Sequence, residues 1–201
     1  MKKLPVSFYK RNDVIVIARE LIGKVLITNF NRVRTSARIV ETEAYVAMID
    51  KASHAFGGRR TSKNEHMYSK PGTAYVYICY GMHQMFNVVT NERGIADAVL
   101  IRAVEPIEGL VEMSNRTGKL TNDPTITRGP GNVGKAMGIF KHHSGSDLLE
   151  KHIFIADDGF IIDQGKLGIS PRIGVASAGK DALLPYRFYI RKNPYVSGKR
   201  N

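Results

Sequence analysis

The sequence predicts a mixed α/β (α+β) fold in a single domain that spans residues 1–201. Segments with the period of an amphipathic helix and segments with the period of a strand both occur along the chain. No change in composition separates two parts of the chain, and 43% apolar residues are enough to build one core.

The first predicted helix lies in NDVIVIARELIGK, where Asp13 can cap the helix N-terminus. Apolar residues recur at helical spacing from Val14 to Leu21, and Gly23 supplies a stop signal. We expect this helix to serve packing only.

Two strand-like segments, KVLITNF and RVRTSARIVETEAY, flank Asn31 and predict an antiparallel hairpin. Alternation in the second strand places Ile39, Glu41, Glu43 and Tyr45 on one face. Taken alone, paired carboxylates of this kind are typical of a solvated strand face.

A long connection covers residues 46–72, and connections of this length are usually functional or disordered. In the strand that follows, Tyr75, Tyr77 and Cys79 fall on one face and Tyr80 falls on the other. This alternation predicts that two tyrosines of one segment have different surroundings.

The rest of the chain predicts short helices and strands in turn. An apolar strand from about Ala98 to Ala103 contains Arg102, which needs a partner if it is buried. Helices are predicted in EGLVEMSNRTGK and, after a glycine-rich turn, in RGPGNVGKAMGIF. Further strands are predicted in HIFIADD, PRIGVAS and YRFYIRK.

The charge balance indicates a polyanionic partner. Thirty Lys and Arg against 18 Asp and Glu give a net charge of +12, which favours nucleic acid as the ligand. Cys79 is the only cysteine, which excludes an intrachain disulfide and a multi-thiolate zinc site. No segment has the length and apolarity of a signal peptide or membrane span, so we expect a cytoplasmic protein without membrane contact.

The segment GPGNVG, residues 129–134, satisfies the G-x-G-x-x-G pattern of dinucleotide-binding loops. No clear apolar strand precedes it, so a contact with a nucleic-acid phosphate and a plain turn before a helix both remain open. The six histidines form no H-E-x-x-H pattern, and no G-x-S-x-G is present. What remains is a strand carboxylate, several tyrosines, a loop histidine and a basic surface, a combination suited to stacking unpaired bases.

Five segments, in this order, resemble the alkyladenine (3-methyladenine) DNA glycosylase family: RIVETEAY, SHAFGGRRTSKNEHMYSKPGTAYVYICYGMHQMFNVV, AVLIRAVEPIEG, GPGNVGKAMGI and PYRFYIRKNPYVS. The resemblance covers residues 13–198. It implies a curved antiparallel β-sheet similar to the C-terminal domain of formyltransferases.

The resemblance also implies a base excision repair enzyme. Such an enzyme flips alkylated or deaminated purines out of double-stranded DNA and hydrolyses the N-glycosidic bond, leaving an abasic site. It needs no metal or other cofactor. We expect a bacterial monomer that associates with the nucleoid through DNA binding.

Individual roles follow from the same resemblance. Glu43 is the general base for the attacking water, and Arg102 helps to hold that water. Tyr45 stacks on one face of the flipped base, while His54 and Tyr77 line the other face.

Asn87 guards the pocket floor against normal guanine, and Tyr80 is the wedge that fills the vacated space in the duplex. Glu41 receives no role, and we expect it to pair with a nearby Arg or Lys. Four basic residues are candidates for phosphate contacts, with a solvated loop as the alternative: Arg59, Arg60, Lys63 and Lys70.

Two alternatives stay open. The first is a non-catalytic nucleic-acid-binding protein with the same aromatic and basic surface. The second is a nucleotide-binding enzyme that uses GPGNVG. The candidate lesions, 3-methyladenine, 7-methylguanine, hypoxanthine and ethenoadenine, are not ranked by the sequence.

Overall fold

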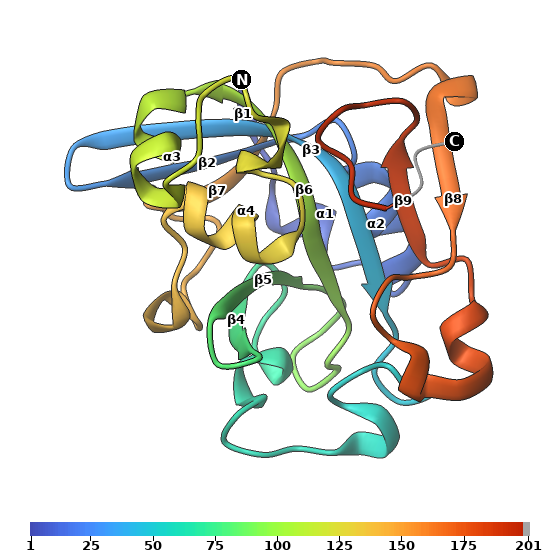
Figure 1. Ribbon diagram of the computed structural model, residues 1–201. Helices are drawn as coiled ribbons and strands as arrows, with labels where there is room; N and C mark the ends of the chain where they lie inside the picture. Colours follow the sequence, from blue (N-terminus) through green and yellow to red (C-terminus); the bar gives the residue numbers. More distant parts are fainter. Residues whose placement is uncertain (199–201) are drawn as a thin grey trace.

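The computed structural model describes residues 1–198, and it combines a curled antiparallel sheet with short helices (Figure 1). The α-helices are α1 (Val6–Tyr9), α2 (Val14–Leu21), α3 (Leu110–Thr117) and α4 (Pro130–Met137). The strands are β1 (Lys2–Lys3), β2 (Val25–Phe30), β3 (Val33–Tyr45), β4 (Ala74–Cys79), β5 (His83–Val89), β6 (Ala98–Glu108), β7 (Ile153–Asp157), β8 (Leu167–Ser170) and β9 (Arg187–Ile190). This arrangement confirms the predicted α+β class. Residues 199–201 of the predicted domain lie outside the described residues.

The long strand β3 organises the sheet. The strand order is β1-β7-β2-β3-β6-β5-β4, and β9 joins β3 and carries β8. The first half of β3 pairs with β2, its last residues pair with β9, and β6 runs along its other edge (Figure 1). The C-terminal half of β3 therefore has neighbours on both edges.

The helices cover one face of this sheet. Asp13 caps α2 as predicted, since its carboxylate accepts from the backbone N–H groups of Ile15 and Val16. Helix α2 packs on β3, and α4 packs on β5 and β6. The Thr42 hydroxyl donates to the Ala18 carbonyl at 2.8 Å, so this side of β3 faces α2. Because strand side chains alternate, the residues next to Thr42 face away from the helices.

Turn chemistry explains the first hairpin. Asn31 and Arg32 both have positive φ, at 49° and 64°, and they connect Phe30 to its cross-strand partner Val33. Two residues of this kind between paired strands form the tight turn that matches strand twist. The predicted hairpin around Asn31 is confirmed.

The alternation predicted for Ile39 is wrong because β3 carries a bulge. Its pairing with β6 changes register between Ile39 and Glu41. Ile39 consequently packs in the main core, while Val40 packs with Ala103 in a separate cluster. An extra residue in one strand reverses the side-chain alternation on either side of it.

The strand predicted at PRIGVAS is also wrong. Strand β8 ends at Ser170, and Pro171, which follows, has no N–H to donate to a sheet ladder. Gly174 has a φ of +80°, which strand residues avoid. The chain turns toward β3 here, where Arg172 donates to the Ala44 carbonyl at 2.9 Å.

The glycines of GPGNVG let α4 approach the β4–β5 hairpin closely. A Cβ atom on Gly134 would lie 2.4 Å from the Gln84 carbonyl oxygen, and one on Gly131 would lie 2.6 Å from the His83 ring. Gly129 precedes α4 with a φ of +86°, and Pro130 begins the helix. Close packing and a turn before a helix therefore account for this pattern.

Gly134→Ala is expected to lower the free energy of unfolding by about 1–3 kcal/mol, because α4 must move away from a backbone oxygen that cannot rotate aside. Gly131→Ala is the matched control, since the exposed His83 ring can shift and alanine favours the helix by up to ~1 kcal/mol. Urea denaturation of both variants measures the difference. Equal stability of the two variants would contradict the packing explanation.

Candidate active site

A row of side chains crosses four strands on the face opposite α2. Glu43 on β3 is in register with Leu100 on β6, Leu100 with Asn87 on β5, and Asn87 with Tyr75 on β4. Registered partners in antiparallel strands point to the same face. Sheet pairing thus brings residues separated by more than 50 positions in sequence to one surface.

Glu43 lies at the centre of this surface and is fully buried. One carboxylate oxygen accepts the backbone N–H of Ile173 at 2.7 Å and lies 3.3 Å from Nη1 of Arg102. The other oxygen accepts the Tyr45 hydroxyl at 2.8 Å. Two hydrogen-bond donors and one ion pair therefore hold the carboxylate in one orientation.

Burial raises the pKa of Glu43 above its ordinary value of 4.5, against the lowering effects of Arg102, Ile173 N–H and Tyr45 O–H. A carboxylate with a raised pKa is the stronger base once it is ionised. The geometry and the electrostatics both suit Glu43 to accept a proton from water.

Arg102 reaches Glu43 through a second irregularity of the sheet. Glu41 pairs with Ala103 and Thr42 with Ile101, which leaves Arg102 as the extra residue of β6 at this point. Bulges next to active sites commonly redirect a side chain. The Arg102 guanidinium here lies between the two carboxylates, with Nε 3.2 Å from Oε1 of Glu41.

Glu41 serves as the counter-ion of two buried arginines. Besides Arg102, it accepts from Nε of Arg187 at 2.6 Å and from the backbone N–H of Ser197 at 2.8 Å. The Ser197 hydroxyl also lies 2.6 Å from Oε2. The expectation that Glu41 pairs with Arg is confirmed, and its oxygens are fully used.

Tyr45 packs between Glu43 and Arg172. The guanidinium carbon of Arg172 lies 4.8 Å from the centre of the Tyr45 ring, within the range of a cation–π contact. Burial, followed by the charge of Glu43, raises the pKa of Tyr45, so its hydroxyl remains a donor at neutral pH.

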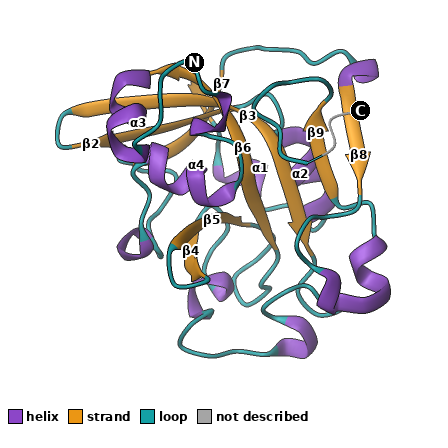
Figure 2. Cartoon of the chain, viewed as in Figure 1, coloured by secondary structure: helices purple, strands orange, loops and turns teal. Residues whose placement is uncertain are grey.

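The aromatic side chains of β4 meet the long connection between β3 and β4, which Figure 2 shows as loop with short helical turns. The rings of His54 and Tyr77 lie 4.6 Å apart, and those of Tyr75 and Tyr77 lie 5.6 Å apart. Nδ1 of His54 shares a hydrogen bond of 3.0 Å with the Tyr75 hydroxyl. Tyr75 therefore orients His54, a role that the sequence did not indicate.

The charges around this cluster affect its protonation. Desolvation by neighbouring protein atoms and the charge of Arg59 lower the pKa of His54, although the residue is exposed. Burial raises the pKa of Tyr77, with smaller effects of Cys79, Tyr75 and Glu43. Both rings are neutral at neutral pH, and Tyr77 is close enough to Glu43 to sense its charge.

Asn87 is buried, and its amide nitrogen donates to the backbone carbonyls of Tyr75 at 3.2 Å and Met85 at 3.1 Å. Among residues 1–198, no group donates to its Oδ1. The side-chain amide is thus fixed with an acceptor that remains available.

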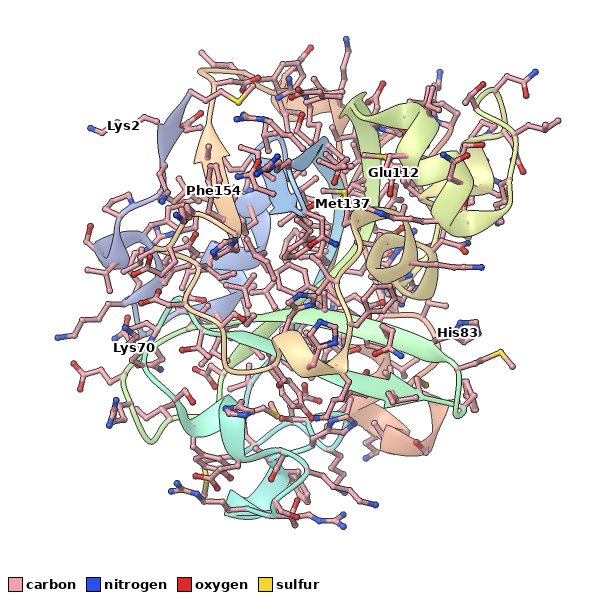
Figure 3. The ribbon with its side chains drawn as sticks, turned by 90° about the vertical axis from the view of Figure 1, so that its left-hand side faces the viewer. Lys2, Lys70, His83, Glu112, Met137 and Phe154 are labelled. Atoms are coloured by element: carbon pink, nitrogen blue, oxygen red, sulfur yellow. The ribbon has the colours of Figure 1, made fainter. Side chains whose placement is uncertain are left out.

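The structure corrects the position of Tyr80. Strand β4 ends at Cys79, so Tyr80 lies in the turn of the β4–β5 hairpin and not on a strand face. The turn is closed by the Met82 N–H and the Cys79 carbonyl at 3.2 Å, and Tyr80 and Gly81 have φ values of 49° and 73°. Tyr80 is 87% exposed, at the end of the molecule where Figure 3 shows His83.

The four basic candidates for phosphate contacts differ in their present partners. Arg60 binds both oxygens of Glu65, and Lys70 lies 2.6 Å from Asp147. Arg59 and Lys63 are exposed. The charges of Arg60 and Lys70 are therefore partly balanced within the protein.

Sequence reasoning missed the residues of the C-terminal third that hold Glu43, Glu41 and the adjacent backbone of β3. These residues are Arg172, Ile173, Arg187 and Ser197. An arginine inside an apolar segment predicts a buried partner, and this signal applied to Arg172 and Arg187 as well as to Arg102. The Ile173 N–H is a backbone group, so the sequence contains no signal for its contact with Glu43.

Two further observations limit the kinds of site in the described part of the chain. Within residues 1–198, no three His, Cys, Asp or Glu side chains form a group that could hold a metal ion. No helix in the same range has the length and apolarity required to cross a bilayer.

Comparison with known proteins identifies a family. A family profile described as methylpurine-DNA glycosylase (MPG) matches residues 7–194. Three relatives carry the provisional name 3-methyladenine DNA glycosylase. A protein from Clostridium perfringens (strain 13 / Type A) is 41% identical, over 96% of this chain and 98% of its own length.

The other two relatives are 44% identical to this chain. One, from Desulfitobacterium hafniense, aligns over 99% of this chain and 100% of its own length. The other, from Methanocella arvoryzae, aligns over 98% of this chain and 96% of its own. The resemblance detected in the sequence is confirmed, and the chain belongs to the methylpurine-DNA glycosylase family.

Proposed function

We propose that this protein removes alkylated purines, and deaminated purines such as hypoxanthine, from double-stranded DNA by means of a water activated by Glu43. As a member of its family, the chain is a monofunctional DNA glycosylase, a hydrolase that acts on N-glycosyl bonds in DNA repair. The observation that carries the mechanism is a buried carboxylate, held by two hydrogen bonds and one ion pair, beside a cluster of tyrosine and histidine rings.

The proposed reaction is a hydrolysis at the sugar. The bond between C1′ and the purine nitrogen breaks, and its electron pair leaves with the base. A cationic alkylated purine leaves as the neutral base, whereas hypoxanthine takes up a proton from solvent as it leaves. Water adds its oxygen to C1′, while one of its protons passes to Glu43. The carboxylate also opposes the positive charge that develops on the sugar. Arg102, 3.3 Å from Glu43, is the second group proposed to hold the water.

The proposed base pocket lies between Tyr45 on one side and His54 with Tyr77 on the other. Electron-rich rings attract a cationic base, and many alkylated purines are cationic. Asn87 forms the proposed floor. Both backbone contacts on Nδ2 hold this amide in place, so it cannot move aside for the bulk of an exocyclic amine, which supports a role in excluding normal guanine.

Tyr80 is proposed to enter the duplex and occupy the space of the flipped base. Its exposure at the tip of a tight hairpin suits a wedge between bases. The net charge of +12 supports phosphate contacts, with affinity for DNA that falls steeply as salt rises. We propose that the protein acts as a monomer.

The experiment that tests this function is base release from four duplex oligonucleotides, each with one lesion: 3-methyladenine, 7-methylguanine, hypoxanthine or ethenoadenine. We expect the free base in solution and an abasic site that breaks only after alkali. Intact lesions in all four duplexes, together with tight and salt-sensitive binding, would favour the non-catalytic nucleic-acid-binding alternative. Strand breaks before alkali would contradict simple hydrolysis.

A further inference from the structure

Arg172 connects three parts of the chain that meet at Glu43. Its guanidinium donates to the Ala44 carbonyl at 2.9 Å, to both oxygens of Asp50, and to the Asp181 carbonyl at 3.1 Å. The side chain is entirely buried. Ala44 is the residue between Glu43 and Tyr45 on β3, and Asp50 lies in the connection that carries His54.

These contacts fix the neighbouring backbone. Ile173, the next residue, donates its N–H to Glu43 at 2.7 Å. The Arg172 guanidinium also packs on the Tyr45 ring at 4.8 Å. No regular strand or helix holds residues 171–175, so the guanidinium contacts and the Ile173 N–H together fix this segment against β3.

We propose that Arg172 is a positioning residue for the glycosylase reaction, whose ion pair with Asp50 keeps the Ile173 N–H on Glu43 and the ring of Tyr45 in place. This proposal rests on the proposed function of Glu43 as the base. Arg172 acts through its neighbours, because its guanidinium is already bound to Ala44, Asp50 and Asp181.

The proposal predicts a change that loss of stability alone would not produce. The Ile173 N–H stabilises the ionised form of Glu43, so its displacement makes Glu43 take up a proton at higher pH. The charged or titratable groups that face Glu43 from the elements around it are Arg102 on β6, Glu41 and Tyr45 on β3, Tyr77 on β4, Arg187 on β9 and Arg172 itself. Arg172→Lys keeps the charge of its site, so a change in pH dependence then reports a change in position.

Arg38→Lys is a matched control. Arg38 also donates to both oxygens of one carboxylate, Asp158, at 3.1 and 2.8 Å, and to a backbone carbonyl, that of Gly23, at 2.7 Å. It also packs on an aromatic ring, that of Phe160, at 4.0 Å. No contact links this second ion pair to Glu43 in the described part of the chain.

The test measures the single-turnover rate of 7-methylguanine release between pH 4.5 and 8.5. Arg172→Lys should slow release at pH 6 by about tenfold and move the acid limb of the profile upward by about half a pH unit. Arg38→Lys should leave both quantities within about twofold of the parent. Affinity for a duplex with an abasic site should stay unchanged in both variants.

Asp50→Glu is the second variant, which keeps both charges of the ion pair but moves the carboxylate that holds Arg172, and circular dichroism verifies that each variant is folded. We expect it to move the acid limb in the same direction. If both variants keep the parent's profile while Glu43→Gln is inactive, the positioning role is overturned and the proposed function stands. If the parent releases no base, the proposed function fails, and the positioning role fails with it.

Discussion

Glu43→Gln is expected to slow base release by about a thousandfold or more, because general-base catalysis typically contributes 10²–10⁴-fold. Glutamine can still accept the Ile173 N–H or the Tyr45 hydroxyl, so the pocket should keep its shape. It cannot take a proton from water. Single-turnover kinetics on a 7-methylguanine duplex, with binding measured on the same duplex, separate the loss of chemistry from a loss of affinity.

Glu108→Gln is the control for this experiment. Glu108 lies at the end of β6 in an exposed pair with Arg34, and its change to glutamine should leave the rate within about twofold. A Glu43→Gln variant that retains more than about a tenth of the parent rate would remove Glu43 as the general base.

Glu41→Gln is expected to lower the free energy of unfolding by about 3–5 kcal/mol, the usual cost of leaving a buried charge without its partner. Glu41 is fully buried and is the counter-ion of both Arg102 and Arg187. In the parent protein, the two carboxylate oxygens accept hydrogen bonds from four donors. The glutamine amide has only one acceptor oxygen for these donors. Denaturation in urea at pH 7 measures the loss.

The same Glu108→Gln variant serves here, since an exposed ion pair usually contributes only about 0–1 kcal/mol. The side chain of Glu108 is 53% exposed, whereas that of Glu41 is fully buried. If both variants lost the same small amount of stability, the explanation of Glu41 as a structural counter-ion would be wrong.

Local patterns predicted much of the fold. The helix after Asp13, the hairpin around Asn31 and the helix in GPGNVGKAMGI each depend on signals within about a dozen residues. The bulges at Ile39–Glu41 and at Arg102 were not predictable in this way, because a bulge is a property of two paired strands. These bulges place Arg102 between the two carboxylates.

The candidate site was only partly predictable, because strand alternation is visible in the sequence but contacts between distant segments are not. Strand alternation grouped Glu41, Glu43 and Tyr45, but it placed Tyr80 on a strand that ends one residue earlier. The Ile173 N–H contributes to Glu43 across 130 positions of sequence. A backbone donor carries no residue signature, so only the folded chain reveals that contact.

The most direct test of Glu43 as the general base is the pH dependence of 7-methylguanine release by the unmodified protein. This base is already cationic, so it needs no acid to leave, and the rate should depend on the ionisation of the general base and on the loss of the proton from His54, which repels a cationic base when charged. We expect the rate to rise with pH as Glu43 ionises above 4.5, the ordinary pKa of Glu, and then to stay constant once His54 is also neutral. A rate that is flat or falls as pH rises through this range would contradict the role of ionised Glu43.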